Sequence, residues 1–151
     1  MGTTIRGNAE LKRKLAKLKD MKQVVPAVAA ASLHVKGKIA KYPRSTEANS
    51  PMARAWYQRG WGSKWRVRNG DIHGNQTSED LGPSWTRKLD REGFSITIGN
   101  DTSYGPYVQG DKQTGFHKRH GWKDTDIVVS KEKATVLKFI KKKVDEILQR
   151  G

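Results

Sequence analysis

The chain has 151 residues, enough for one domain with a buried core, but Leu, Ile, Val and Phe supply only 29 of them and the net charge is +15. The core must be thin, and we expect neighbouring molecules to supply part of the missing apolar burial. The sequence has no cysteine, and its longest apolar run, 24–31, is short and contains a proline. We therefore expect a soluble intracellular protein with no disulfide, no thiolate metal site and no membrane span.

Two helices are predicted in the N-terminal part, 8–42. Apolar residues recur every three or four positions in 9–21, as on one face of an amphipathic helix: Leu11, Leu15, Leu18 and Met21. A second apolar stripe runs through 24–42. Pro26 fits only the first turn of that helix, and Pro43 ends it by disfavouring helical geometry at the preceding residue.

Loops and a small antiparallel sheet are predicted in the middle part, 43–129. Pro and Gly residues mark 43–63 and 73–84 as loops. Between these loops, Trp65 and Val67 alternate with basic residues, which predicts a half-buried strand over 64–68.

The clearest strand signal is a β-hairpin. Apolar residues alternate in 85–89 and again in 94–98, on either side of a turn at 90–93. Two short segments, 107–109 and 127–129, are further candidates for extended structure. The residues between them contain too much glycine and charge to predict regular structure.

A C-terminal helix is predicted over 130–150, with Ser130 as its N-cap. Its apolar stripe follows helical spacing: Leu137, Ile140, Val144 and Leu148. Together the elements predict an α+β fold in a single domain, 1–151. N-terminal helices and a C-terminal helix pack on a small antiparallel β-sheet that has long loops.

The stretch 103–122, SYGPYVQGDKQTGFHKRHGW, raises the question of catalysis or metal binding. His117 and His120 could ligate a metal with Asp111 or Asp124, but the intervening Lys118-Arg119 pair would repel a cation. The other carboxylates occupy turns, where their backbone hydrogen bonding explains them. Neither a nucleophile elbow nor a phosphate-binding glycine loop is present. We therefore expect no enzymatic activity, no metal and no cofactor.

The stretch 54–68 interleaves aromatic and basic residues, and its partner is ambiguous. Aromatic faces stack on bases and cations hold phosphates, so nucleic acid is one reading, which the net charge favours. Trp and Arg also dominate protein interfaces, and the spacing alone does not separate the two readings. The residues that would face DNA are Arg54, Arg59, Lys64, Arg66, Arg68, and Lys141, Lys142 and Lys143 in the C-terminal helix.

The order of these pieces resembles the neck, tail-completion and minor tail proteins that join head to tail in tailed bacteriophages. Its most specific parts are TSEDLGPSW at 77–85 and YGPYVQG at 104–110. Ile98-Gly99-Asn100, Phe116-His117 and Gly121-Trp122 also match. The family's Pro-x-x-Thr-Gly after the second helix is altered here to PRSTE at 43–47, so the resemblance is to a divergent branch.

This resemblance implies a structural virion protein that forms a hexameric or dodecameric ring at the neck or tail terminus. Its partners would be further copies of itself, portal or adaptor proteins, and tail-tube or tail-terminator proteins, with non-specific contact to genomic DNA. It would assemble in the host cytoplasm and remain in the virion. The expected interface residues are Trp56, Tyr57, Trp61, Trp65, Tyr104, Pro106, Tyr107, Phe116, His117 and Trp122. We expect Ala at Trp122 or Tyr107 to weaken assembly more than subunit stability.

Overall fold

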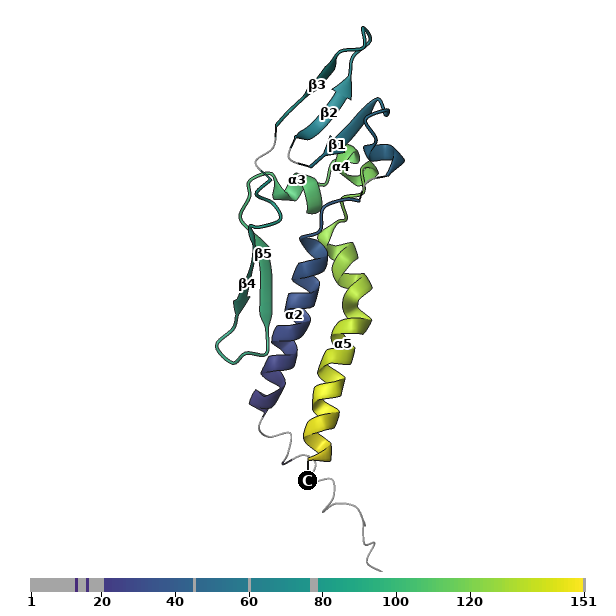
Figure 1. The fold of residues 1–151 in the computed structure, drawn as a ribbon. Helices are drawn as coiled ribbons and strands as arrows, with labels where there is room; N and C mark the ends of the chain where they lie inside the picture. The colour runs from purple at the N-terminus through teal and green to yellow at the C-terminus, as the bar shows by residue number, and fades with distance from the viewer. Residues whose placement is uncertain are drawn as a thin grey trace, which may run out of the picture.

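A computed structural model describes residues 13, 16, 21–44, 46–59, 61–76 and 79–150. They form an elongated molecule with two halves (Figure 1). The helical half contains two long helices and a β-hairpin, and the sheet half contains a three-stranded sheet and two short helices. The predicted α+β fold class is confirmed. The predicted helix 9–21 lies outside the described residues, except for Arg13 and Ala16, which are helical, and Met21.

Two antiparallel helices run along the whole length of the helical half. After the 3-10 turn η1 (Met21–Val24), α2 (Val25–Ile39) runs beside α5 (Thr125–Gln149), as Figure 1 shows. Pro26 lies in the first turn of α2, as predicted, because its missing N–H costs no intrahelical hydrogen bond there. The second predicted helix is therefore confirmed, although it ends at Ile39.

The start of α5 differs from its prediction. The helix begins at Thr125, and Asp124 is its N-cap, with a carboxylate oxygen that accepts a hydrogen bond from Asp126 N at 2.8 Å. The extended structure predicted for 127–129 is therefore wrong. A β-branched run favours a strand only weakly, and here the cap and the burial of Val128 in the helical half override that preference.

The predicted β-hairpin is confirmed. Strand β4 (Trp85–Leu89) pairs antiparallel with β5 (Ile96–Asn100) and lies along α2 (Figure 1). The Arg87 guanidinium reaches α2 and donates to Ser32 Oγ at 2.9 Å. At the turn, Gly93 has a φ of +81°, and an added Cβ would lie 2.8 Å from the Val25 side chain. The turn is thus held close to the start of α2.

The sheet half has a separate antiparallel sheet, in the order β1 (Ala55–Gln58), β2 (Gly62–Arg66) and β3 (Ile72–Gly74). A 3-10 turn, η2 (Glu47–Asn49), precedes it. The loops predicted at 43–63 and 73–84 are wrong where they overlap β1 and β3. The strand predicted over 64–68 overlaps β2, so it is confirmed in part. Strands of three or four residues are too short to show an alternating pattern, so β1 and β3 were missed.

Two short helices, α3 (Gly105–Gln109) and α4 (Gly115–Arg119), lie where extended or irregular structure was predicted. Pro106 stands in the first turn of α3, where its fixed φ favours a helix. Thr114 caps α4, because its Oγ1 accepts a hydrogen bond from His117 N. Local proline and capping geometry therefore outweighed the glycine-rich composition.

Each half has a small core, and the Gln109 side chain is one of the links between the halves. The helical core contains Val35, Ile39, Trp85 and Val128, and the sheet core contains Tyr57, Leu81, Val108 and Trp122. The buried Gln109 amide donates to Ile39 O at 3.0 Å and to Lys123 O at 3.2 Å, at the end of α2 and just before α5. Among the described residues no large side chain is fully buried, which agrees with the thin core expected from composition.

Candidate functional site

Three of the residues predicted to form an interface lie inside the sheet half. Trp56, Tyr57 and Trp122 keep at most 9% of their surface exposed. The Trp122 ring centroid lies 5.2 Å from that of Tyr42 and 5.4 Å from that of Tyr57, both in edge-on geometry. These side chains are core residues of the subunit, so substitution of Trp122 is now expected to act first on folding.

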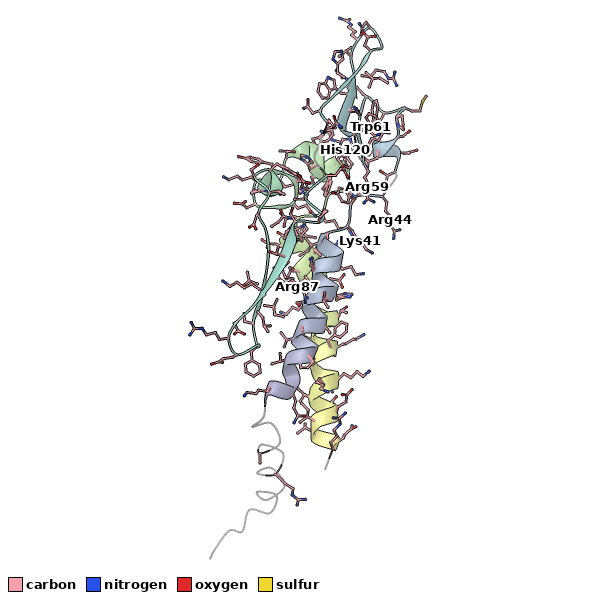
Figure 2. The ribbon with its side chains drawn as sticks, turned by 60° about the vertical axis from the view of Figure 1, so that its left-hand side comes forward. Lys41, Arg44, Arg59, Trp61, Arg87 and His120 are labelled. Atoms are coloured by element: carbon pink, nitrogen blue, oxygen red, sulfur yellow. The ribbon has the colours of Figure 1, made fainter. Side chains whose placement is uncertain are left out.

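A second group of predicted interface residues is accessible to a partner. The exposed members are Trp61 (56%), Tyr107 (49%), Trp65 (39%) and Pro106, and the half-buried members are Tyr104, Phe116 and His117. Figure 2 shows Trp61 at the side of the sheet half, in line with Arg59, Arg44 and Lys41 toward the end of α2. These accessible residues, unlike the buried ones, can contact another molecule.

The two histidines near the end of α4 have structural roles. His117 Nδ1 lies 2.7 Å from Thr114 Oγ1. The buried His120 ring lies between two carbonyl oxygens, with Nδ1 2.7 Å from Phe116 O and Nε2 2.9 Å from Ala55 O. Burial, and secondarily the charge on His120, lowers the pKa of His117 below its ordinary value.

The part of the chain that the structure describes contains no group of three His, Asp or Glu side chains that could hold a metal ion. The His117 and His120 nitrogens instead face a hydroxyl and backbone carbonyls. The His-x-x-His spacing in this sequence therefore serves helix capping and the attachment of α4 to β1.

The basic residues predicted to face DNA fall into separate environments. Arg59 stacks over the Tyr42 ring at 4.8 Å and lies 3.7 Å from Glu79, and Lys64 lies over the Trp61 ring at 5.6 Å. On α5, two of the three lysines are paired with carboxylates, Lys141 with Asp145 at 2.7 Å and Lys143 with Glu146 at 3.4 Å. Local partners thus already use much of the positive charge at these positions.

The remaining three arginines line a groove of about 1310 Å³, which we call the arginine groove. Arg54, Arg66 and Arg68 come from β1, β2 and their flanks, and Arg119 comes from the end of α4. Trp65 and the buried His120 also line it. Sequence reasoning missed Arg119, because the charge of HKRH was used only as an argument against a metal.

A second groove, of about 610 Å³, was not predicted at all. It lies between the hairpin, α2 and α5, and its walls are largely aliphatic: Val28, Val35, Ile96, Ile98, Val129, Val136 and Ile140. Periodicity places apolar residues on a face of each element, but it does not tell how far apart the elements stand.

The two most specific motif stretches meet where the halves join. Asn100 Nδ2 donates to Leu81 O at 2.7 Å, and Asn100 Oδ1 accepts from Thr102 N at 3.0 Å. An added Cβ at Gly105 would lie 3.0 Å from Thr102 Oγ1 and 3.5 Å from Leu81 Cδ1. These motif residues therefore fix the path of the chain between the hairpin and α3.

Comparisons of the chain with protein-family models, with curated proteins and with solved structures give no match. Within the described residues, every helix is too short or too polar to cross a bilayer. We therefore infer function from the surfaces and contacts of the chain itself.

Proposed function

We propose that the chain is a structural virion protein of a tailed bacteriophage that forms a ring at the neck or tail terminus and joins the head to the tail. The resemblance of 77–85 and 104–110 to that family supports the proposal. The proposed partners are further copies of the chain, in a hexamer or dodecamer, together with portal or adaptor and tail-tube or tail-terminator proteins. The proposal gives the chain no catalytic role.

The observation that carries the proposal is the amount of apolar surface left uncovered. Large hydrophobic side chains that are more than a third exposed occur in both halves, among them Met52, Trp61, Tyr107, Ile127 and Leu137. Leu137 was predicted to lie on the buried face of α5, yet it is 55% exposed. Exposed apolar surface of this extent is typical of proteins that bury it against other molecules.

Ring contacts would use the accessible aromatic residues of the sheet half. A ring joins two different patches of the same chain, so a single altered patch is enough to stop it from closing. Trp61 and Tyr107 are the most exposed aromatic side chains among the described residues. Aromatic side chains at the centre of an interface commonly supply much of its binding energy.

The test is the oligomeric state of the parent chain and of a variant with both Trp61→Ser and Tyr107→Ser. Light scattering over a range of concentrations, with electron micrographs, should show six- or twelve-membered rings for the parent and monomers for the variant. Both should melt at similar temperatures, because the two side chains are exposed. Met52→Ser is the control: Met52 is 89% exposed, lies outside the predicted interface, and its loss should leave the rings intact.

A parent chain that remains monomeric at every soluble concentration, and gives no rings in micrographs, would contradict self-assembly. Loss of rings in the Met52 control as well would show that general apolar surface, rather than these two aromatic residues, drives association.

A further inference from the structure

We propose that the arginine groove binds the phosphate backbone of a nucleic acid. This site shares Trp65 with the accessible residues of the proposed ring contacts, but it does not include Trp61 or Tyr107 and does not depend on ring formation. It also replaces the broader set of basic residues predicted from the sequence with a smaller set that the fold brings together.

The arginine groove carries positive charge that no nearby carboxylate compensates. The guanidinium groups of Arg54, Arg66, Arg68 and Arg119 line one groove, and no acidic side chain lines it. Among the described residues, no carboxylate forms an ion pair with any of these four groups. Several positive charges in one groove produce a strong positive potential there, which raises the local concentration of polyanions. Three of the other basic residues predicted to face DNA are different, because Arg59, Lys141 and Lys143 have carboxylate partners.

Hydrogen bonds hold the arginine groove in place before any ligand binds. The His120 ring bridges Phe116 O and Ala55 O and so fixes the end of α4 against β1, which places the adjacent Arg119 beside the strands. Asn49 strengthens this link: its amide donates to His120 O at 2.9 Å, and its Oδ1 accepts from Tyr57 N at 3.2 Å.

Arg66 is fixed in a similar way. Its two terminal nitrogens donate to Gly70 O at 3.2 Å and Pro51 O at 3.1 Å. A guanidinium has five N–H donors, so donors remain for an anion after these two bonds are made. A preorganised guanidinium loses less entropy on binding phosphate than a mobile lysine does.

The composition of the groove favours nucleic acid over an acidic protein segment. Guanidinium forks match the two oxygens of a phosphate, and the partly exposed Trp65 indole offers a flat face beside them. Trp65 is backed by the His73 ring, with centroids 6.3 Å apart and an interplanar angle of 19°. Aromatic faces beside a cationic groove are typical of sites that follow a nucleic-acid strand.

The test compares two variants that lose the same charge. The groove variant carries Arg54→Gln, Arg68→Gln and Arg119→Gln; Arg66 is kept because it bonds the backbone. The control variant carries Lys131→Gln, Lys133→Gln and Lys138→Gln, three exposed lysines on α5. Fluorescence anisotropy measures the affinity for labelled duplex and single-stranded DNA as salt is raised. Probes of about 20 nucleotides are used because they are longer than the stretch that one small binding module covers.

The plot of log K against log salt has a negative slope, and each phosphate contact contributes roughly 0.7 to 0.9 to its steepness. Loss of three contacts should therefore make the slope of the groove variant less steep by about 2 to 3. The control should keep the parent slope. Comparison of the two probes shows whether the strand is single or paired. Circular dichroism melting of both variants checks that they are folded.

Equal losses of slope in the groove and control variants would overturn the proposal, since they would show only the attraction of a basic surface for a polyanion. A labelled poly-glutamate peptide tests the other partner class. If that peptide binds in a groove-dependent manner and neither DNA probe does, the groove is a site for acidic protein and the proposal is also overturned.

Discussion

The two halves of the molecule are held together in different ways. In the helical half, aliphatic side chains recur along α2 and α5 and cover one face of each helix, while the hairpin lies alongside α2. In the sheet half, the core residues come one at a time from separate segments, and two of the four are aromatic. Side-chain amides and hydroxyls bond to backbone carbonyls between those segments, as Asn49 does to His120 O and Tyr42 does to Glu79 O.

This difference shows where each half is vulnerable. The helical core is open on one side, since the groove of about 610 Å³ reaches Trp85 between the hairpin and the helices. The sheet core borders a smaller pocket, of about 230 Å³, in which Trp122 is packed edge-on against Tyr42 and Tyr57. Removal of a side chain packed between rings leaves a cavity, whereas removal of one at the wall of a wide groove leaves space that solvent or a partner already reaches.

The largest effect that separates the halves is expected from Trp122→Ala. Removal of this buried indole should lower the free energy of unfolding by about 3–5 kcal/mol, because it takes away apolar burial and leaves a cavity that the surrounding rings cannot fill. Urea unfolding followed by circular dichroism measures the loss. The sequence instead predicted that Trp122→Ala would weaken assembly more than subunit stability. A loss of stability of this size would show the opposite order of effects.

The matched change in the helical half is Trp85→Ala. Trp85 is 7% exposed and Trp122 is 6% exposed, so the two substitutions remove similar burial. The loss for Trp85 should be smaller by about 1 kcal/mol or more, because the open groove contributes little cavity energy. Equal losses would show that the two cores are equally closed.

A smaller effect is expected from Gln109→Ala at the junction between the halves. The substitution leaves Ile39 O and Lys123 O without their donor, which should cost about 2–3 kcal/mol in all. It should also loosen the attachment of the sheet half to the helical half. Hydrogen exchange measured by mass spectrometry should therefore become faster both near the end of α2 and near the start of α5.

Gln113→Ala is the control for that experiment. Gln113 donates to Val108 O at 2.7 Å and to Trp122 O at 3.0 Å, so its loss removes two similar bonds that lie within the sheet half. Faster exchange should then be confined to α3, α4 and their neighbours. The same exchange pattern in both variants would mean that Gln109 does not couple the halves in a special way.

The same contrast explains how much of the fold the sequence predicts. Apolar periodicity extends over many residues in α2, α5 and the hairpin, so these elements were predicted, apart from the start of α5. Strands β1 and β3 and helices α3 and α4 span five residues or fewer, and they are fixed by contacts with distant segments. Short elements of this kind contain too few positions for a period to appear.

The candidate sites were predicted only in part. The stretch 54–68 was correctly singled out as rich in aromatic and basic residues, but its members separate in space: Trp56 and Tyr57 are buried, Arg59 stacks on Tyr42, and Arg54 lines the arginine groove. Strand alternation divides neighbours between faces, and sequence spacing gives no sign of which face is covered. Arg119 joins the groove only because His120 attaches α4 to β1.

The smallest expected effect concerns the helical half alone and depends on pH. Glu132 on α5 lies 2.6 Å from His34 Nε2 on α2, and this hydrogen bond lowers the pKa of the Glu132 carboxyl, an effect that burial opposes and Lys38 and Lys123 reinforce. A carboxyl whose pKa is lower in the folded state stabilises the fold above its unfolded pKa of about 4.5, and this contribution is lost as the pH falls through the folded value. Melting temperatures of the parent should therefore drop more steeply below that pH than those of Glu132→Gln, and the two should converge in acid.

Glu92→Gln is the control, because it makes the same chemical change in the exposed hairpin turn. Its melting temperatures should follow those of the parent at each pH. If Glu92→Gln flattens the pH profile as much as Glu132→Gln does, the pair between α2 and α5 is not the cause.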